Sequence, residues 1–242
     1  MRPHLPLTAV LLSACTVLAA QETPVPVLPA FDPTVFADPQ PNRWFPLTPG
    51  PTRIYEGRSA DGELARSAVT VQGPGPEILG VRTVAVLDEA WEDDLLAERT
   101  LDYFAADNDG NVWYMGEDVT NYRYDDEDRL LGTDQDSAWR AGVNGAGPGI
   151  IMPAEPQVGA AYFEEHAPAD GAMDYGRIEA VGLTLDGPAG PFTDVVRIFD
   201  GSTIDPDARE WKFYAPDLGP VREEEDLDAS LADPGLVVEL QP

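Results

Sequence analysis

The chain has 242 residues, with 44 acidic and 15 basic side chains and a net charge of −29 at pH 7. Binding to nucleic acid phosphates requires clustered Lys and Arg, so this charge excludes nucleic acid as a partner. The only cysteine is Cys15, so the rest of the chain has no disulfide, no thiolate metal ligand and no cysteine nucleophile.

The N-terminal segment predicts export. Arg2 precedes an apolar run over residues 5–12, and Leu11-Leu12-Ser13-Ala14-Cys15 matches a lipobox. Residues 1–20 are therefore a predicted signal peptide, and Cys15 is the predicted lipidation site through which a membrane of the cell envelope would hold the protein. The alternative is ordinary cleavage after Ala19, which would give a secreted or periplasmic protein.

Residues 21–42 are rich in proline, which favours an extended, semi-rigid chain. The prolines of this segment are Pro24, Pro26, Pro29, Pro33, Pro39 and Pro41. We expect a tether between the predicted anchor and the folded domain.

Residues 43–225 predict one β domain, because short apolar or alternating runs are separated there by Gly, Pro, Asp and Asn. The expected strands are Arg53–Glu56, Ala65–Val71, Val81–Leu87, Glu98–Ala106, Asn111–Glu117, Thr120–Tyr124, Ala160–Glu165, Met173–Leu185, Val195–Asp200, Glu210–Ala215 and Pro220–Glu223. This pattern predicts an all-β, mainly antiparallel fold with few or no helices, either a single curved sheet, a half-barrel or a sandwich. Residues 226–242 are expected to be an acidic C-terminal tail, and the acidic run over residues 223–233 is expected to be a short helix or unordered.

The clearest predicted hairpin turns at Asp107-Asn108-Asp109-Gly110, where Gly and Asn tolerate the positive φ of a tight turn. The same acidic stretch suggests a calcium site with Asp107, Asp109, Asn111, Glu117 and Asp118 as candidate ligands. It fits neither register of the twelve-residue EF-hand loop. Calcium is the one cofactor that the sequence suggests.

Glu164 and His166 are the candidate catalytic residues, because only there does a histidine of the folded part meet carboxylates. Strand alternation predicts both side chains on one face, as a general base or metal site would require. The hypothesis is weakened because His166 would be the sole imidazole ligand. The glycine-rich run over residues 142–149 lacks a Gly-Lys-Ser/Thr ending and predicts a structured loop before Ile150–Met152.

Several motifs together resemble a group of exported, β-rich bacterial proteins of unknown function, over about residues 42–223. They include Phe45-Pro46-Leu47-Thr48-Pro49-Gly50, Asp109-Gly110-Asn111-Val112-Trp113-Tyr114, Trp139-Arg140-Ala141-Gly142-Val143 and Phe213-Tyr214-Ala215-Pro216. The resemblance implies a β fold and an exported location, and it implies no catalytic residues.

The sequence therefore predicts an exported cell-envelope protein that is a non-enzymatic binding or structural module. Two alternatives stay open. One is a metal-assisted hydrolase that uses His166 and nearby carboxylates, and the other is an extracellular calcium-binding protein.

Overall fold

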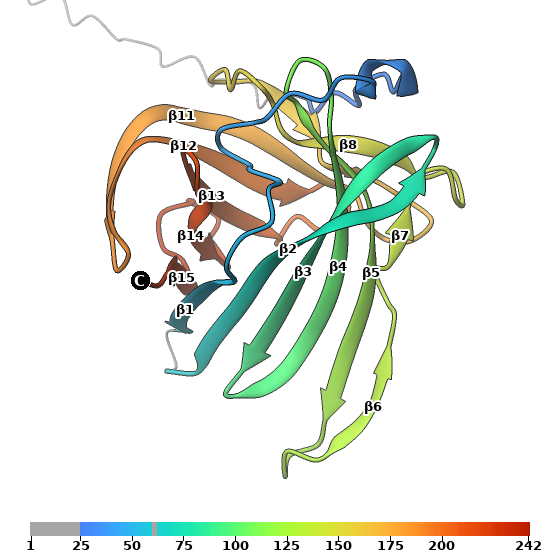
Figure 1. Cartoon of the computed structure of the whole chain (residues 1–242). Helices are drawn as coiled ribbons and strands as arrows, with labels where there is room; N and C mark the ends of the chain where they lie inside the picture. The colour runs from blue at the N-terminus through green and yellow to red at the C-terminus, as the bar shows by residue number, and fades with distance from the viewer. Residues whose placement is uncertain (1–24, 60–61) are drawn as a thin grey trace, which may run out of the picture.

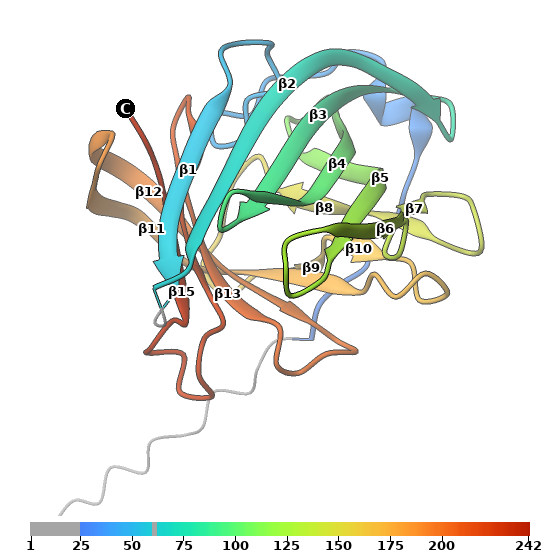
Figure 2. The ribbon, with the colours of Figure 1, turned by 90° about the horizontal axis from the view of Figure 1, so that it is seen from below.

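The computed structural model of the protein describes residues 25–59 and 62–242. Over these residues, fifteen strands form one antiparallel sheet that curls until it is nearly closed (Figures 1 and 2). The described residues contain no α-helix, and the one helical turn is the 3-10 helix η1 (Pro33–Phe36). The prediction of an all-β, antiparallel, curved sheet is confirmed.

The strands divide into long ones, which build most of the wall, and short ones near the ends of the sheet. The long strands are β2 (Leu64–Ile78), β3 (Val81–Glu92), β4 (Leu95–Ala106), β5 (Val112–Tyr124), β11 (Asp174–Gly187) and β12 (Gly190–Ser202). The shorter ones are β1 (Arg53–Ser59), β6 (Leu130–Asp134), β7 (Trp139–Arg140), β8 (Gly147–Met152), β9 (Ala161–Phe163), β10 (Glu165–His166), β13 (Arg209–Ala215), β14 (Gly219–Glu225) and β15 (Leu236–Leu240).

The two ends of the sheet meet at one residue. The strand order runs β10-β8-β5-β4-β3-β2-β1-β15-β14-β13-β12-β11-β9, with β6 and β7 both pairing with β5 outside this path. The end strands β9 and β10 follow each other in the chain and are separated only by Glu164. The chain therefore leaves one end of the sheet and enters the other at Glu164, which lies at the seam of the nearly closed wall.

A close approach of backbones at this seam requires glycine in the glycine-rich run. Residues 147–152 form β8, which pairs with β5 and β10, so the predicted loop is shorter than expected. A Cβ atom on Gly149 would collide with the carbonyl oxygens of Phe163 and Glu164. The missing side chain lets β8 pass directly against the β9–β10 connection.

The two strands expected over residues 111–117 and 120–124 are a single strand, β5. Gly116 lies in this strand with a φ of +132°, next to an irregularity in the pairing of β4 with β5. Glycine accepts this backbone conformation at little cost, so the strand continues through the irregularity.

The last residues of the expected C-terminal tail are part of the sheet, and β14 already includes the start of the acidic run over residues 223–233. Residues 236–240 form β15, which pairs with β1 on one side and β14 on the other. Val238 and Leu240 are buried in this strand. Burial of these side chains and two ladders of hydrogen bonds stabilise this end of the chain.

The proline-rich segment is also packed against the domain in its described part, and is not a free tether there. Phe31 and Phe36 lie 5.9 Å and 5.7 Å from Trp113, measured between ring centroids. Asn42 is buried and donates to the carbonyl oxygens of Gly110 and Pro153. Aromatic packing holds residues 31–42 on the sheet, which proline content alone does not reveal.

The predicted signal peptide, including Cys15 and the alternative cleavage site after Ala19, lies outside the described residues. Within the described part of the chain, no helix has the length and apolar character needed to cross a membrane.

Candidate functional site

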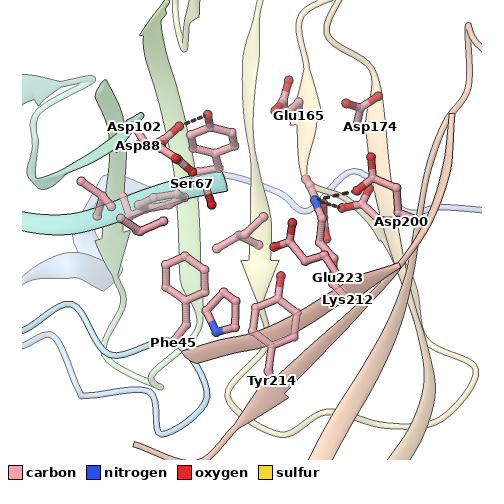
Figure 3. A pocket seen from close by; sticks show the side chains of 18 of the residues that line it. Phe45, Ser67, Asp88, Asp102, Glu165, Asp174, Asp200, Lys212, Tyr214 and Glu223 are labelled. Carbon is pink, nitrogen blue, oxygen red and sulfur yellow. Dashed lines mark hydrogen bonds and ion pairs between the residues drawn. The ribbon is translucent and has the colours of Figure 1, made fainter. Parts of the chain in front are cut away.

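The interior of the curved sheet contains a cavity of about 280 Å³ that is lined by acidic side chains (Figure 3). Strand alternation points most of these residues inward, since every second side chain of a strand faces the same side. Eight carboxyl groups line the cavity: Asp88, Asp102, Glu164, Glu165, Asp174, Asp200, Glu210 and Glu223. Carboxylates that are crowded into one partly enclosed space repel one another and lose hydration. The cavity therefore favours the binding of either protons or cations.

One cation stands among these acids, and it is the only lysine of the chain. Lys212 projects from β13, and its Nζ lies 2.5 Å from Asp200 Oδ2 and 3.5 Å from Glu210 Oε2. Burial lowers the pKa of Lys212, but the neighbouring carboxylates of Asp200 and Glu210 outweigh it and hold this pKa well above its ordinary value. The ammonium group therefore stays charged and neutralises part of the wall formed by β12 and β13.

The opposite wall holds acids that share a tyrosine hydroxyl. Tyr114 Oη lies 2.5 Å from Asp102 Oδ1 and 3.0 Å from Glu117 Oε2. A hydroxyl has one proton to donate, so a hydrogen bond to both carboxyls requires one of them to be protonated and to donate in return. Burial raises the pKa of Asp102 to about 6 and the pKa of Glu117 to about 8, which keeps such a proton in place near neutral pH.

Asp88 has a buried oxygen without a partner. Its Oδ1 atom is shielded from solvent and makes no hydrogen bond to any residue that the structure describes, while the side chain lines the cavity beside Asp102 (Figure 3). Burial, followed by the charge of Asp102, raises the pKa of Asp88 to about 8. An unpaired buried acceptor costs free energy, so the fold holds this carboxyl in place at a cost to stability.

The seam adds two further acids at the far side of the cavity. Glu164 is buried with 3% of its surface exposed, and Glu165 lies near Asp174 in Figure 3. Burial raises the pKa of both Glu164 and Glu165 well above the ordinary value, and the charge of Asp200 adds to the effect on Glu164. Both acids therefore tend to hold protons when no other cation is near.

These raised values predict that the protein loses stability as the pH rises. In the unfolded chain the carboxyls ionise near pH 4, whereas in the folded protein the pKa of Asp102 is about 6, that of Glu210 about 7 and that of Asp88 about 8. Between these limits the folded state binds more protons than the unfolded state, so the free energy of unfolding falls with pH. Raising the pH from about 5 to about 8.5 should lower the melting temperature by about 5–10 °C.

Thermal denaturation followed by circular dichroism across this pH range measures the effect. The double variant Asp88→Asn, Asp102→Asn should flatten the dependence, because its amides do not titrate. A melting temperature that stays constant or rises toward pH 8.5 in the unaltered protein would contradict the raised pKa values.

The structure separates the two candidate catalytic residues. Glu164 is a bend residue at the seam, and both Glu164 and Glu165 line the cavity. His166 is absent from the described lining, and its ring packs edge-on against Phe163 with 5.3 Å between centroids. The bend at the seam interrupts the alternation that would have placed Glu164 and His166 on one face.

The candidate calcium ligands fall into two places. Asp107, Asp109 and Asn111 lie at the end of the β4–β5 hairpin, where the Asp107 carboxylate accepts hydrogen bonds from the backbone of the turn. Glu117 and Asp118 lie further along β5, opposite Asp102 and Leu101. The structure does not bring the five residues together.

Glu117 and Asp118 also bind different partners. Glu117 bonds to Tyr114 at the cavity, while Asp118 accepts from Tyr103 Oη at 2.7 Å and pairs with Arg140 at 2.6 Å. Within residues 25–59 and 62–242, no group of three or more His, Cys, Asp or Glu side chains is arranged to hold a metal ion. The calcium site stays a prediction for titration to test.

The residues that build the cavity carried a weak signal in the sequence. Asp102 and Lys212 each stand at the centre of a predicted strand between apolar or aromatic neighbours, Leu101 and Tyr103 or Trp211 and Phe213. A charged residue in such a place either faces solvent or enters a polar interior. The rarity of lysine in this chain was the one feature that set Lys212 apart.

No protein-family model matches the chain, and a search of curated proteins gives no match. Two solved structures are similar to it. One is an inferred exported protein with a YmcC-like fold from Bacteroides fragilis, at 14% identity and a TM-score of 0.42, covering 83% of this chain and 98% of that one. The other is an inferred lipoprotein from Parabacteroides distasonis, at 14% identity and a TM-score of 0.40, covering 84% of this chain and 98% of that one.

The names of both structures describe exported or lipoprotein proteins, the class that the resemblance in the sequence indicates. At this level of identity and similarity, they assign no ligand, partner or activity to the chain.

Proposed function

We propose that the protein is an exported, non-enzymatic binding module that takes a small organic cation, an amine, into the interior of its curved sheet. The observation that carries the proposal is the cavity of about 280 Å³, in which eight carboxyl groups face a single lysine. The predicted signal peptide supports export, with Cys15 as the anchor to a membrane of the cell envelope.

Lys212 supports an amine as the ligand, because its ammonium group is already bound by carboxyl groups of this cavity. Asp200 and Glu210 hold this ammonium on one side of the cavity. Among the described residues, no Lys or Arg forms an ion pair with Asp88, Asp102 or Glu165 on the other side. A second ammonium group there would meet the carboxyl groups of Asp88, Asp102 and Glu165, which line the cavity, and complete the charge balance.

An organic cation fits this arrangement better than a bare divalent ion does. Calcium requires six to eight oxygen ligands at about 2.3–2.6 Å, converging on one point. The carboxyls of this cavity come from opposite walls and are spread around a space for several non-hydrogen atoms, with apolar surface from Phe45, Val86 and Ile151 between them. This mixture of acid and apolar surface suits an ammonium group that carries carbon.

Binding should be coupled to proton release. The carboxyls that receive the amine hold protons near neutral pH, since burial raises the pKa of Asp88 to about 8. The cation must displace these protons, so the affinity for an amine should increase as the pH rises from about 6 to about 8.5.

Isothermal titration calorimetry with butylamine at about pH 8 tests the proposal. We expect binding, with proton release shown by repeating the titration in buffers of different ionisation enthalpy. The double variant Asp88→Asn, Asp102→Asn should lose about 10-fold or more in affinity, since a hydrogen bond to a charged group contributes about 1.5–3 kcal/mol. Asp109→Asn is the matched control, because Asp109 is exposed at the hairpin end.

The proposal fails if the folded protein binds no amine at this pH, or if Asp109→Asn weakens binding as much as the cavity variant does. Calcium chloride is titrated in parallel. Tight binding of calcium with no binding of butylamine would favour the calcium site predicted from the sequence.

A further inference from the structure

A second and larger pocket lies next to the acidic cavity. Its volume is about 600 Å³, and it is enclosed by residues 36–49 of the N-terminal segment and by the ends of β2, β3, β4 and β5. Among the polar side chains of this pocket, Asn42 and Thr83 bond to the backbone carbonyls of Gly110 and Pro76 respectively, and so are not available to a ligand. Gln40, Thr48 and Arg82 are exposed at the surface. The surface that remains is mostly apolar, from proline, valine, alanine, leucine and phenylalanine.

The two pockets lie one after the other along the strands, on the inner face of the curved sheet. On each of three strands, a residue that lines the apolar pocket lies two positions from one that lines the acidic cavity: Val84 and Val86 on β3, Ala106 and Phe104 on β4, Val112 and Tyr114 on β5. Residues two apart in a strand face the same side and are separated by about 7 Å. The acidic cavity and the apolar pocket are therefore neighbours along the strands.

Phe45 separates the two spaces. It lines both of them, and its ring centroid lies 4.9 Å from that of Phe104 and 6.3 Å from that of Tyr214. Figure 3 shows Phe45 and Tyr214 at the end of the cavity that is opposite to Glu165 and Asp174. Movement of this one side chain, which is only half-buried, would join the two spaces.

We infer that the ligand is a cationic amphiphile, whose amine head enters the acidic cavity while its unbranched apolar tail passes Phe45 into the apolar pocket. This inference rests on the proposed function and adds the class of ligand. An acidic space that borders an apolar one, with only Phe45 shared between them, is complementary to a molecule with charge at one end and hydrocarbon at the other. It also gives the packed N-terminal segment a role, because residues 36–49 form the wall that covers the tail.

Affinity measured over a series of alkylamines tests the inference. Ethylamine, butylamine, octylamine and dodecylamine are titrated into the purified protein at about pH 8, below the concentration at which any of them forms micelles. We expect the affinity to increase with length by up to about fourfold for each methylene group that becomes buried. Phe45→Ala should keep this gain and speed the association of the longer amines.

Two variants fill the apolar pocket from opposite walls, namely Ala106→Trp from β4 and Thr48→Trp from the N-terminal segment. Each should abolish the gain from octylamine and dodecylamine and leave ethylamine binding within about twofold of the unaltered protein. Because Thr48 is exposed, its variant should fold even if Ala106→Trp does not. Val181→Trp on β11 is the matched control, since Val181 is exposed and lines neither pocket.

The outcomes separate the two proposals. The inference of an amphiphilic ligand is wrong if ethylamine and butylamine bind but longer tails add no affinity. It is also wrong if the filling variants weaken the binding of all four amines equally. In both cases the proposed amine site stands. If none of the amines binds, the proposed function itself is wrong.

Discussion

Replacing Lys212 by methionine should lower the melting temperature by about 10 °C at about pH 8. Lys212 is bound to Asp200, whose side chain is only 9% exposed, and removal of one partner of a buried ion pair costs about 3–5 kcal/mol. For a domain of this size, each kcal/mol lowers the melting temperature by about 2–4 °C. Methionine has a similar length and no charge, so the loss would come from the unpaired acids and not from a void.

The pH dependence of this loss identifies its cause. Near pH 5 the cavity acids can take up a proton in place of the ammonium group, so the loss should be less than half of that near pH 8. The double variant Lys212→Met, Asp200→Asn should regain most of the stability, because the amide leaves no unpaired charge. A loss that is equal at both pH values would indicate a packing defect instead.

Arg129→Met is the matched control for the removal of a cation. Arg129 pairs with Asp125 and Glu127 at the surface, and its side chain is 71% exposed. Exposed pairs contribute about 0–1 kcal/mol, so this variant should change the melting temperature by no more than about 3 °C. Circular dichroism at both pH values compares the two variants directly.

Local patterns in the sequence were enough to predict the class of fold and most of the strands. The alternation over residues 98–106 and 210–215 and the turn at Asp107–Gly110 are local signals, and the structure has β4, β13 and the β4–β5 hairpin there. The turn needs only the positive φ of Gly110, which is +90°. Where short-range geometry decides the structure, the sequence was sufficient.

Elements that depend on distant partners could not be predicted in this way. β15 follows an acidic run and forms because β1 and β14 lie on both sides of it. The proline-rich segment is held by the contacts of Phe31 and Phe36 with Trp113, which lies far away in the sequence. Composition describes what a segment does in isolation, and neither segment is isolated in the fold.

The candidate site was missed for the same reason. Alternation places Asp88 and Asp102 on one face of their strands, but it does not say which face becomes the interior. Glu164 was predicted only as a partner of His166, the single histidine of the folded part. In the structure Glu164 instead lies near Asp200 and Lys212. Only closure of the sheet shows that acids from opposite ends of the chain share one cavity.

Replacing Asp107 by alanine should also lower the melting temperature by about 10 °C. The carboxylate is 4% exposed and accepts four hydrogen bonds, from the backbone N–H groups of Asp109 and Asn111, from Asn111 Nδ2 and from Trp113 Nε1, at 2.8–2.9 Å. Alanine would leave at least two of these donors buried without an acceptor, at about 1–3 kcal/mol each. Thermal denaturation measures the loss.

The loss should spread to the N-terminal segment, because the hairpin end holds it in place. Gln40 N donates to the carbonyl oxygen of Asp107, and Asn108 N donates to that of Val35. Hydrogen exchange should therefore quicken over residues 35–42 in Asp107→Ala, and it should stay unchanged in the exposed control Asp109→Ala.

Calcium distinguishes this structural role from the metal site that the sequence suggests. If Asp107 acts only as an acceptor for the turn, millimolar calcium should leave the melting temperature of the unaltered protein unchanged, because the carboxylate is already satisfied by four donors. A rise in melting temperature with calcium that disappears in Asp107→Ala would instead establish the metal site. Residues 35–42 form part of the wall of the apolar pocket. If Asp107 stabilises the turn that holds this segment, Asp107→Ala should therefore weaken dodecylamine binding more than ethylamine binding.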